Sequence, residues 1–236
     1  MLEGPHHQAL LYTKRVFGGA RCAVAWYLLV AQTALPGPAA PDSLGSVDSL
    51  LGIPAGLALS TAAGLRIFVP LLLTSAAARF GYITLAPGMT WIGSDAALVA
   101  FATATVLEVA AYYVPWLDTL LDTIATPTAI TAGAITMAAV TPELSPLVRW
   151  TLAVVAGGGA ASLVQVSTAL LRLKSSALTA GVGNPVVATG ELVGSITLAL
   201  LGLLAPLLGV AAVVVLLITL VPRLSRLRGR RRSRAA

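Results

Sequence analysis

The sequence has little charge, few aromatic residues and a single cysteine. Of its 236 residues, 10% are charged and 6% aromatic, whereas 57% are hydrophobic and the mean hydropathy is +0.90. Because soluble domains carry roughly 25% charged residues, this chain would have too little polar surface to fold in water. The excess of Ala, Leu, Val and Gly suits close helix packing in lipid. We therefore predict an all-α fold, a polytopic helical membrane protein.

The residues that most enzymes need are also missing. Cys22 is the only cysteine, so no internal disulfide and no Cys/His zinc spacing can exist. Both histidines precede residue 8, which excludes Ser–His pairs and HExxH zinc sites from the apolar part. No Walker, GxGxxG or GxSxG motif is present. We expect no enzyme, no cofactor and no metal site.

Positive charge is concentrated at the C-terminus. The net charge is +6, and seven of the 15 basic residues lie between Arg223 and Arg234, directly after the apolar run Val210–Val221. Basic residues beside a membrane segment mark the cytoplasmic side and attract anionic lipid headgroups. We predict a multi-pass protein of the cell (inner) membrane with a cytoplasmic tail, 223–236. Its partners would be lipid headgroups or another protein, and not nucleic acid.

The chain divides into three parts. Residues 1–45 form an N-terminal extension with basic residues and the short apolar stretch Cys22–Ala34. This stretch resembles a signal peptide or signal anchor but is shorter than the ~20 residues that span a bilayer. A misassigned start codon is a third interpretation. Residues 46–222 form the predicted helical membrane domain, ahead of the tail.

We expect five to seven membrane segments. The first, Pro54–Ala78, is long enough to span but is interrupted by Gly64, Arg66 and Pro70. Asp95–Trp116 is a second helix. The stretch between Pro127 and Pro142 reaches only ~21 Å at 1.5 Å per residue, against a ~30 Å hydrocarbon core. It is therefore predicted to be re-entrant, or a thin span.

The second half contains three further segments. Leu147–Leu171 is a full helix with three central glycines, 157–159. Ser175–Ala205 is long and broken between Gly181 and Pro185, and Leu207–Val221 is the last span. In lipid, a break must have its backbone groups satisfied by protein or water, so it implies a cavity, a ligand or a packed kink.

A short internal similarity links the two broken segments. ALSTAAG ends at Gly64, and ALTAGVG ends at Gly183. Paired interrupted segments are typical of repeat-built transporters. With Arg79, Arg172 and Lys174 all inside, the two segments run in opposite directions, provided that the 127–142 stretch is re-entrant. The alternatives are an inverted repeat and chance similarity.

At these residues the sequence resembles a bacterial integral-membrane family known as domain of unknown function 4126. The similar stretches are GLALSTAAGLRIFVPLLL from Gly56, WIGS from Trp91, VLEVAAYYVPWLDTLLDTIATPTAITAGAI from Val106 and TAGVGNPVVATGELVGSITLALLGLLAP from Thr179. The resemblance covers roughly residues 46–222. The family often has an Asp-Lys pair and an Arg where this chain has Tyr112, Tyr113 and Thr126, so no role for those charges carries over. The family has no established activity, and the resemblance implies architecture only.

Three ionisable residues lie within the apolar segments: Arg66, Glu108 and Glu191. Each costs about 2.5–3.5 kcal/mol at the bilayer centre and needs a partner or water. Arg66 can pair with Glu108 or with Glu191, which would only lock the helices together. Alternatively, one carboxylate takes up a proton or cation while Arg66 holds it or an anion. Snorkelling to the lipid surface is the third interpretation.

The second break supplies further candidates. Gly183 and Pro185 permit a non-helical path, and Asn184 could add an amide to a site there. Secondary candidates, whose hydroxyls and carboxylates could join a site, are Ser60, Thr61, Thr179, Asp118 and Asp122. The hydroxyls can instead bond back to helix carbonyls, and the two aspartates can be a solvated face or cap.

These residues favour a small transporter or channel-like protein. Its site would lie where two broken helices meet near mid-membrane, lined by Arg66, Glu108, Glu191 and Asn184, with a proton or small ion as the coupled species. The alternative is a non-transporting membrane scaffold whose buried charges only staple helices and whose tail binds lipid or a partner. The composition also allows a homo-oligomer.

Overall fold

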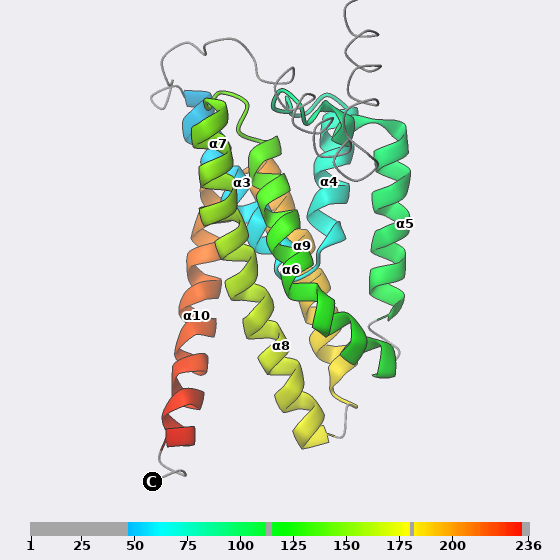
Figure 1. The fold of residues 1–236 in the computed structure, drawn as a ribbon, viewed down its shortest axis with the longest axis vertical. Coiled ribbons are helices and arrows are strands. Elements are labelled where there is room, and N and C mark those ends of the chain that lie inside the picture. The colour runs from blue at the N-terminus through cyan, green and yellow to red at the C-terminus, as the bar shows by residue number, and fades with distance from the viewer. Residues whose placement is uncertain (1–46, 112–114, 180–181, 233–236) are drawn as a thin grey trace, which may run out of the picture. The chain divides into compact units, whose positions relative to one another are not determined.

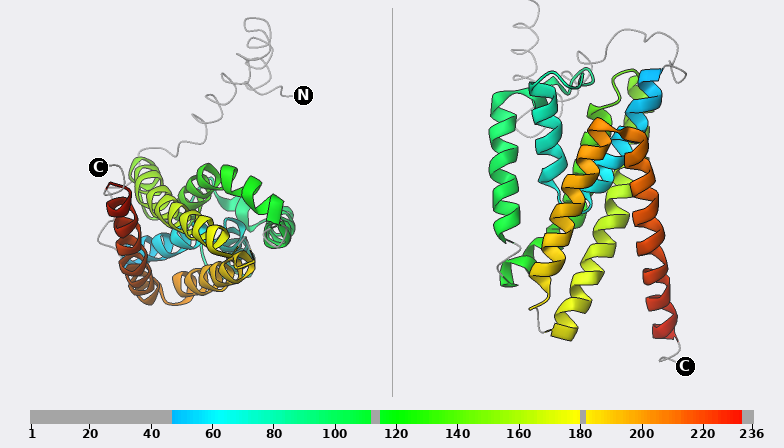
Figure 2. Two further views of the ribbon diagram at one scale, coloured as in Figure 1. Left: turned by 90° about the horizontal axis from the view of Figure 1, so that it is seen from below. Right: turned by 180° about the vertical axis from the view of Figure 1, so that it is seen from behind.

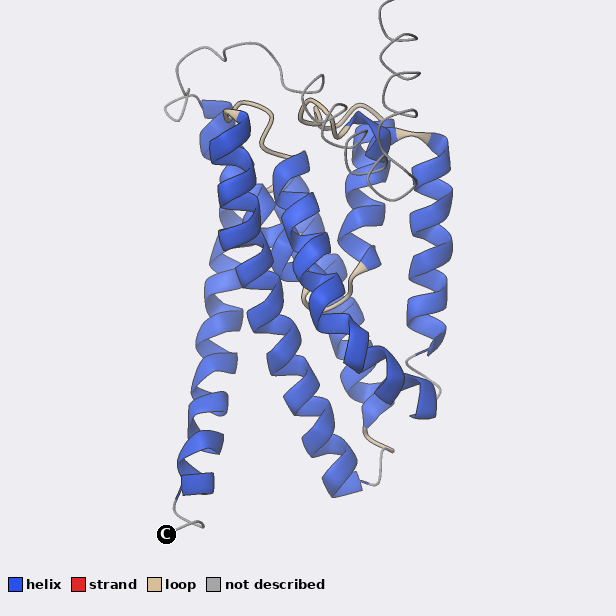
Figure 3. Cartoon of the chain, in the orientation of Figure 1, coloured by secondary structure: helices blue, strands red, loops and turns tan. Residues whose placement is uncertain are grey.

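The computed structural model describes residues 47–111, 115–179 and 182–232, with side chains described for 51–111, 124–179 and 182–219. This part of the chain is all-α and has no strand, as predicted (Figure 3). Residues from Pro41 onward form one compact unit. The predicted extension 1–45 and residues 233–236 of the predicted tail lie outside the described residues.

The first broken segment is a hairpin of two short helices, α3 (Val47–Ala63) and α4 (Phe68–Arg79). A Cβ at Gly52 would lie 2.8 Å from the carbonyl oxygen of Val140, and the Ala86 amide donates to the carbonyl of Ala139 at 2.9 Å. The start of α3 and the loop that follows α4 thus both lie beside the C-terminal end of one helix, Pro115–Ala139 (Figure 1). The prediction that 54–78 is one interrupted span is wrong.

Proline and glycine explain why the helix stops and restarts. Pro70 has no amide proton, and its ring would clash with the carbonyl of Arg66 in a continuous helix. In the first turn of a new helix, that missing proton costs nothing. The amides of Leu65 and Arg66 both turn back to Ala62, at 3.0 Å, and close α3. We call residues 64–67, between the two helices, the hairpin tip.

The remaining helices pass along the bundle in alternating directions (Figures 1 and 2). They are α5 (Asp95–Ala111), α6 (Pro115–Ala139), α7 (Pro146–Leu152), α8 (Gly159–Thr179), α9 (Asn184–Leu204) and α10 (Pro206–Arg232). A short 3-10 helix, η1 (Thr90–Gly93), precedes α5. We call the end that holds Gly52 and Ala139 the entry end, and the end that holds Thr179 and Arg232 the tail end.

The stretch 127–142, predicted to be re-entrant or a thin span, belongs as far as Ala139 to a longer continuous helix that starts at Pro115. α6 has 25 residues and passes through Pro127. An internal proline removes one hydrogen bond and can bend a helix without ending it. Pro127 therefore does not mark the start of a helix, as the sequence had suggested. At 1.5 Å per residue, α6 is roughly 37 Å long, enough to cross a bilayer. It begins toward the tail end, whereas α4 ends with Arg79 at the entry end, so Arg79 and Lys174, which were predicted on one side, lie toward opposite ends of the bundle (Figure 1).

The helix predicted at 147–171 is present, and its glycines permit close packing. A six-residue π-helical turn, Ala153–Gly158, joins α7 to α8. A Cβ at Gly157 would lie 2.7 Å from the carbonyl oxygen of Gly133 in α6. Close approach of backbones at small residues is typical of packing between membrane helices.

The second predicted break is a turn between two helices at the tail end. α8 continues to Thr179 and α9 begins at Asn184, so 175–205 is not one broken segment. The Gly183 amide donates to the Thr179 hydroxyl at 2.9 Å, which helps to close the end of α8. Both predicted repeat segments thus contain a helix end, a turn and a new helix, but α3 and α8 both run away from the entry end and α4 and α9 both return toward it (Figure 1), whereas opposite directions were predicted.

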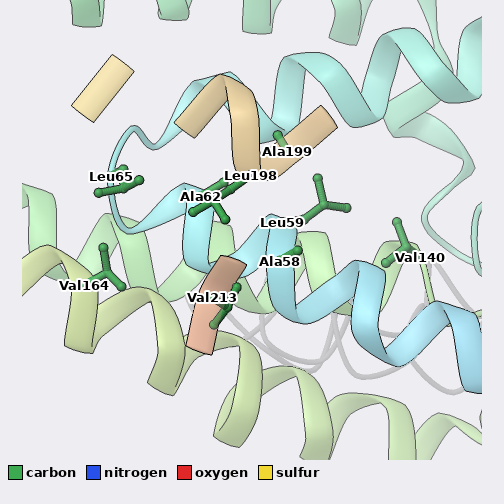
Figure 4. Close-up of a cluster of buried hydrophobic side chains, with 9 residues drawn as sticks. All are labelled: Ala58, Leu59, Ala62, Leu65, Val140, Val164, Leu198, Ala199 and Val213. Atoms are coloured by element: carbon green, nitrogen blue, oxygen red, sulfur yellow. The ribbon is translucent and has the colours of Figure 1, made fainter. Parts of the chain in front are cut away.

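Helix α3 is the centre of the bundle. Ala58, Leu59 and Ala62 are completely buried and contact side chains from α9 and α10 (Figure 4). A Cβ at Gly202 in α9 or at Gly209 in α10 would lie 3.0 Å from the Cβ of Ala58, so the three helices meet at small residues. A helix that is apolar all round belongs in the interior, and here the surrounding helices shield the hairpin.

Two helical stretches are long and apolar enough to cross a membrane: Pro146–Thr179 and Asn184–Leu204. Shorter apolar helices cover Leu51–Ala63, Phe68–Arg79, Ile124–Ala139 and Pro206–Thr219. The described residues thus support membrane association in general, whereas five to seven membrane segments stays a prediction.

Candidate functional site

Four charged side chains from four elements are buried beside the hairpin tip. Arg66 belongs to the tip, Glu108 to α5, Arg172 to α8 and Glu191 to α9. Their exposed fractions are 1%, 6%, 2% and 5%, respectively. Charged residues are rarely buried unless paired, so this concentration is the most unusual chemical feature of the described chain.

Glu191 binds two arginines. Arg172 grips it with two donors, Nε to Oε1 at 3.1 Å and Nη2 to Oε2. Arg66 Nη2 lies 3.5 Å from Oε2 of the same carboxylate and also donates to the carbonyl oxygen of Ala188 at 2.8 Å. Bidentate pairing fixes the planes of both groups as well as their distance. Of the two predicted pairs, the structure forms Arg66–Glu191.

Glu108 caps the start of α4. Its Oε1 accepts the Ile67 amide at 2.8 Å, and its Oε2 accepts the Phe68 amide at 3.1 Å. The first amides of a helix have no partner within the helix and carry the positive end of its dipole. Glu108 was predicted at the site, and it contributes as a backbone ligand rather than as a direct ion-pair partner.

Arg172 was missed by the sequence analysis, which assigned it to the end of a helix. In the structure α8 continues for about two more turns, so Arg172 is buried while Lys174 is exposed. The available signal was its spacing from Gln165. Residues seven apart share a helix face, and Gln165 is also buried, at 2% exposure.

Nε2 of Gln165, Oγ1 of Thr74 and Nε of Arg149 are polar atoms of the described residues that are buried without a hydrogen-bond partner. Each such group normally requires an explanation, such as a bound water or ion. Ser195 was also missed, and its hydroxyl donates to the carbonyl of Ala62 at 3.0 Å, beside the tip.

The candidates from the second predicted break lie at or beside the α8–α9 turn. Thr179 is the last residue of α8, Gly183 lies in the turn, and Asn184 and Pro185 are the first two residues of α9. Asn184 Nδ2 donates to the Ser176 hydroxyl at 2.9 Å, and its helix places it seven residues, or roughly 10 Å, before Glu191. Asn184 therefore lies about two helical turns from the carboxylate that Arg66 binds, and its place in a shared site with Arg66 stays a prediction.

The secondary candidates have structural contacts. Ser60 donates to the carbonyl of Gly133 at 2.7 Å and joins α3 to α6. Thr61 donates back to the carbonyl of Leu57 at 2.7 Å, the alternative predicted for it. The Asp118 and Asp122 side chains lie outside the described part. Among described residues, no group of three or more His, Cys, Asp and Glu is arranged to hold a metal ion.

These features define a class: a helical bundle with a helical hairpin whose tip meets a buried ionic cluster. Residues 53–226 match the family model described as Domain of unknown function (DUF4126), which is more than half of the chain, so the chain belongs to this family. No curated protein and no solved structure shows significant similarity to it.

Proposed function

We propose that this protein is a small multi-pass membrane transporter or channel-like protein whose site is the hairpin tip. The supporting observation is the meeting of a broken helix with Arg66, Glu191 and Arg172, all buried, from three separate elements. Non-helical backbone at membrane depth is tolerated only where protein buries it or where it lines water. Discontinuous helices with charged partners are the usual binding element of transporters.

Glu191 is the residue proposed to couple binding to movement. It holds together the tip, through Arg66, and α8, through Arg172. A proton or cation on its carboxylate would weaken both pairs, and an anion could take the place of the carboxylate on either guanidinium. The buried Gln165 amide, on the same α8 face as Arg172, offers a further polar group.

Purified protein in liposomes tests this proposal. Proton flux would be read with pyranine inside the vesicles under an imposed pH gradient, with sodium acetate, sodium chloride or potassium chloride outside. We expect wild-type vesicles to dissipate the gradient faster than empty vesicles with at least one salt. Glu191→Gln and Arg66→Lys should reduce that flux at least tenfold, because each weakens the link between tip and α9.

Asp95→Asn is the matched control, because Asp95 belongs to an exposed pair with Arg79 at the entry end. It should transport like wild type. All variants are compared at equal amounts of monodisperse protein. Wild-type vesicles no faster than empty ones, or Glu191→Gln as fast as wild type, would contradict the proposal.

A non-transporting scaffold is the second candidate, and the bidentate Arg172–Glu191 pair favours it, because such a pair also staples two helices. In that case, vesicles with the protein would show the same proton flux as empty vesicles in every assay. Binding to liposomes that contain anionic phospholipid would then depend on the basic tail, and a chain ending at residue 222 would lose it.

We also propose a cytoplasmic C-terminus in the cell (inner) membrane. α10 continues into the basic tail as far as Arg232, and its end lies at the same end of the bundle as Lys174 (Figures 1 and 2). This agreement of basic segments is what the positive-inside bias requires.

A further inference from the structure

We propose that Glu108 is a carboxylate latch on the hairpin tip, and that protonation of its side chain releases the tip and opens the site. The inference rests on the proposed function, since it describes how that site is regulated. Glu108 accepts hydrogen bonds from two backbone amides, whereas Glu191 binds Arg66 and Arg172, so separate substitutions test the latch and the ionic cluster.

The latch is formed by one side chain on two backbone amides. Oε1 and Oε2 accept Ile67 and Phe68, respectively, so both oxygens are used. Hydrogen bonds to an ionised carboxylate are roughly twice as strong as neutral ones, and the start of a helix favours negative charge. Ile67 is the residue before the first residue of α4, and no side chain of the tip caps that helix. Glu108, 41 residues away, therefore does so instead.

Helix α5 holds the hairpin at two points of different character. At the entry end, Arg79 Nε donates to Asp95 Oδ1 at 2.5 Å, and both side chains are largely exposed. At the tip, Glu108 is buried. Exposed ion pairs contribute little to stability. The attachment of α5 to the tip therefore depends on the two hydrogen bonds that Glu108 accepts. Loss of that attachment frees the tip while the outer ends stay in place.

Protonation removes this attachment for a chemical reason. A neutral carboxyl group has one carbonyl oxygen that accepts well, and its hydroxyl is a donor that would face an amide donor. The latch is therefore closed when the pH is above the pKa of Glu108 and open when the pH is below it. The charges of Arg66 and Arg172 act on Glu108, and Glu191 on α9 faces both arginines. Burial of the Glu108 side chain, its two hydrogen bonds from backbone amides and these charges together set the pH at which it titrates.

Single-cysteine labelling tests the latch without any transported substrate. In a Cys22→Ser background, Leu65→Cys places a thiol on the buried tip, and Tyr82→Cys places one on an exposed loop at 79% exposure. The readout is the maleimide labelling rate at Leu65→Cys divided by that at Tyr82→Cys, at each pH from 8 to 4.5. This ratio cancels the intrinsic pH dependence of the thiol.

We expect the ratio to rise roughly tenfold as the pH falls, since two charge-assisted hydrogen bonds are lost. With Glu108→Gln the ratio should be high at every pH, because the amide accepts only one of the two bonds. Asp95→Asn, the matched control on the same helix, should leave the wild-type pH response intact. With Glu108→Ala, added formate should lower the ratio again by occupying the two free amides.

A ratio that does not change with pH in the otherwise wild-type chain would overturn the latch. So would a normal pH response in Glu108→Gln, because another group would then control the tip. If Glu108→Gln is not monodisperse, the Glu108→Ala variant with and without formate decides, and no effect of formate overturns the proposal. A normal latch response in a protein that conducts nothing would overturn the transport function alone.

Discussion

Glu191 lies between two guanidinium groups, and this arrangement determines what a single substitution does. Removing one member of a buried ion pair leaves an uncompensated charge, which costs several kcal/mol, whereas exposed charges contribute little. Arg172 and Lys174 are two residues apart in α8, but the first is buried and the second exposed. They are therefore a matched pair for this comparison.

We predict that Arg172→Gln lowers the free energy of unfolding by about 3–5 kcal/mol, because Glu191 loses its bidentate partner. Lys174→Gln should change it by less than about 0.5 kcal/mol. Denaturant unfolding in detergent, followed by circular dichroism, measures both. Equal stability of the two variants would mean that the Arg172–Glu191 pair contributes nothing measurable to the fold.

The prediction of buried charged residues from side-chain chemistry alone was partly correct. Arg66, Glu108 and Glu191 are buried near the tip, because an isolated charge in an apolar segment is costly wherever the segment packs. Arg172 could not be chosen in this way. It sits beside Lys174 and the end of an apolar run, and only the continuation of α8 to Thr179 buries it.

At the scale of the element, the helices meet where side chains are small. The α6 backbone at Gly133 and the π-helical turn at Gly157 approach so closely that a Cβ on Gly157 would lie 2.7 Å from the Gly133 carbonyl oxygen and 2.8 Å from the Met137 Cβ. Gly190, inside α9, would gain a Cβ that meets nothing within 4 Å.

We predict that Gly157→Ala destabilises the protein by about 1–3 kcal/mol, the usual cost of overpacking. Gly190→Ala should be neutral or stabilising by up to about 1 kcal/mol, because alanine favours a helix interior over glycine. Thermal unfolding of the two variants in the same detergent gives the comparison. If Gly157→Ala unfolds at the same temperature as the wild type, α6 and the π-helical turn can move apart without loss of stability.

Local signals predicted where helices are interrupted more reliably than what the interruption does. Gly64 and Pro70 correctly marked a break, because proline cannot continue a helix past the preceding turn. Pro127 carried the same signal and is inside α6. The difference is the packing around each site. At Gly64 the Ala161 carbonyl oxygen would lie 2.4 Å from a Cβ, so the chain turns there against α8.

At the scale of the whole molecule, the hairpin reverses the orientation of everything before α5. A single span over 54–78 would put Leu51 and Tyr82 on opposite sides of the membrane. The hairpin places both at the entry end, with the α8–α9 turn at the other. The start of α6 and the ends of α8 and α10 lie toward that other end as well (Figure 1).

We predict that Leu51→Cys and Tyr82→Cys, each in a Cys22→Ser background, are labelled from the same side of sealed vesicles by an impermeant maleimide. Val182→Cys, which is 81% exposed at the tail end, should be labelled from the opposite side. Labelling of positions 51 and 82 from different sides would contradict the hairpin. Labelling of 82 and 182 from one side would contradict the alternating helices.

Sequence alone determined the all-α class, the family resemblance, the break near Gly64 and three of the four charges buried beside the tip. These follow from composition, from proline chemistry and from the cost of charge in apolar segments, all of which are local. Tertiary structure decided that the chain turns back at the break, that Arg172 is buried and that Glu108 caps α4. Each of these depends on which helices pack together, through contacts between residues as far apart as 41 positions for Glu108 and Ile67 and 122 for Arg66 and Ala188.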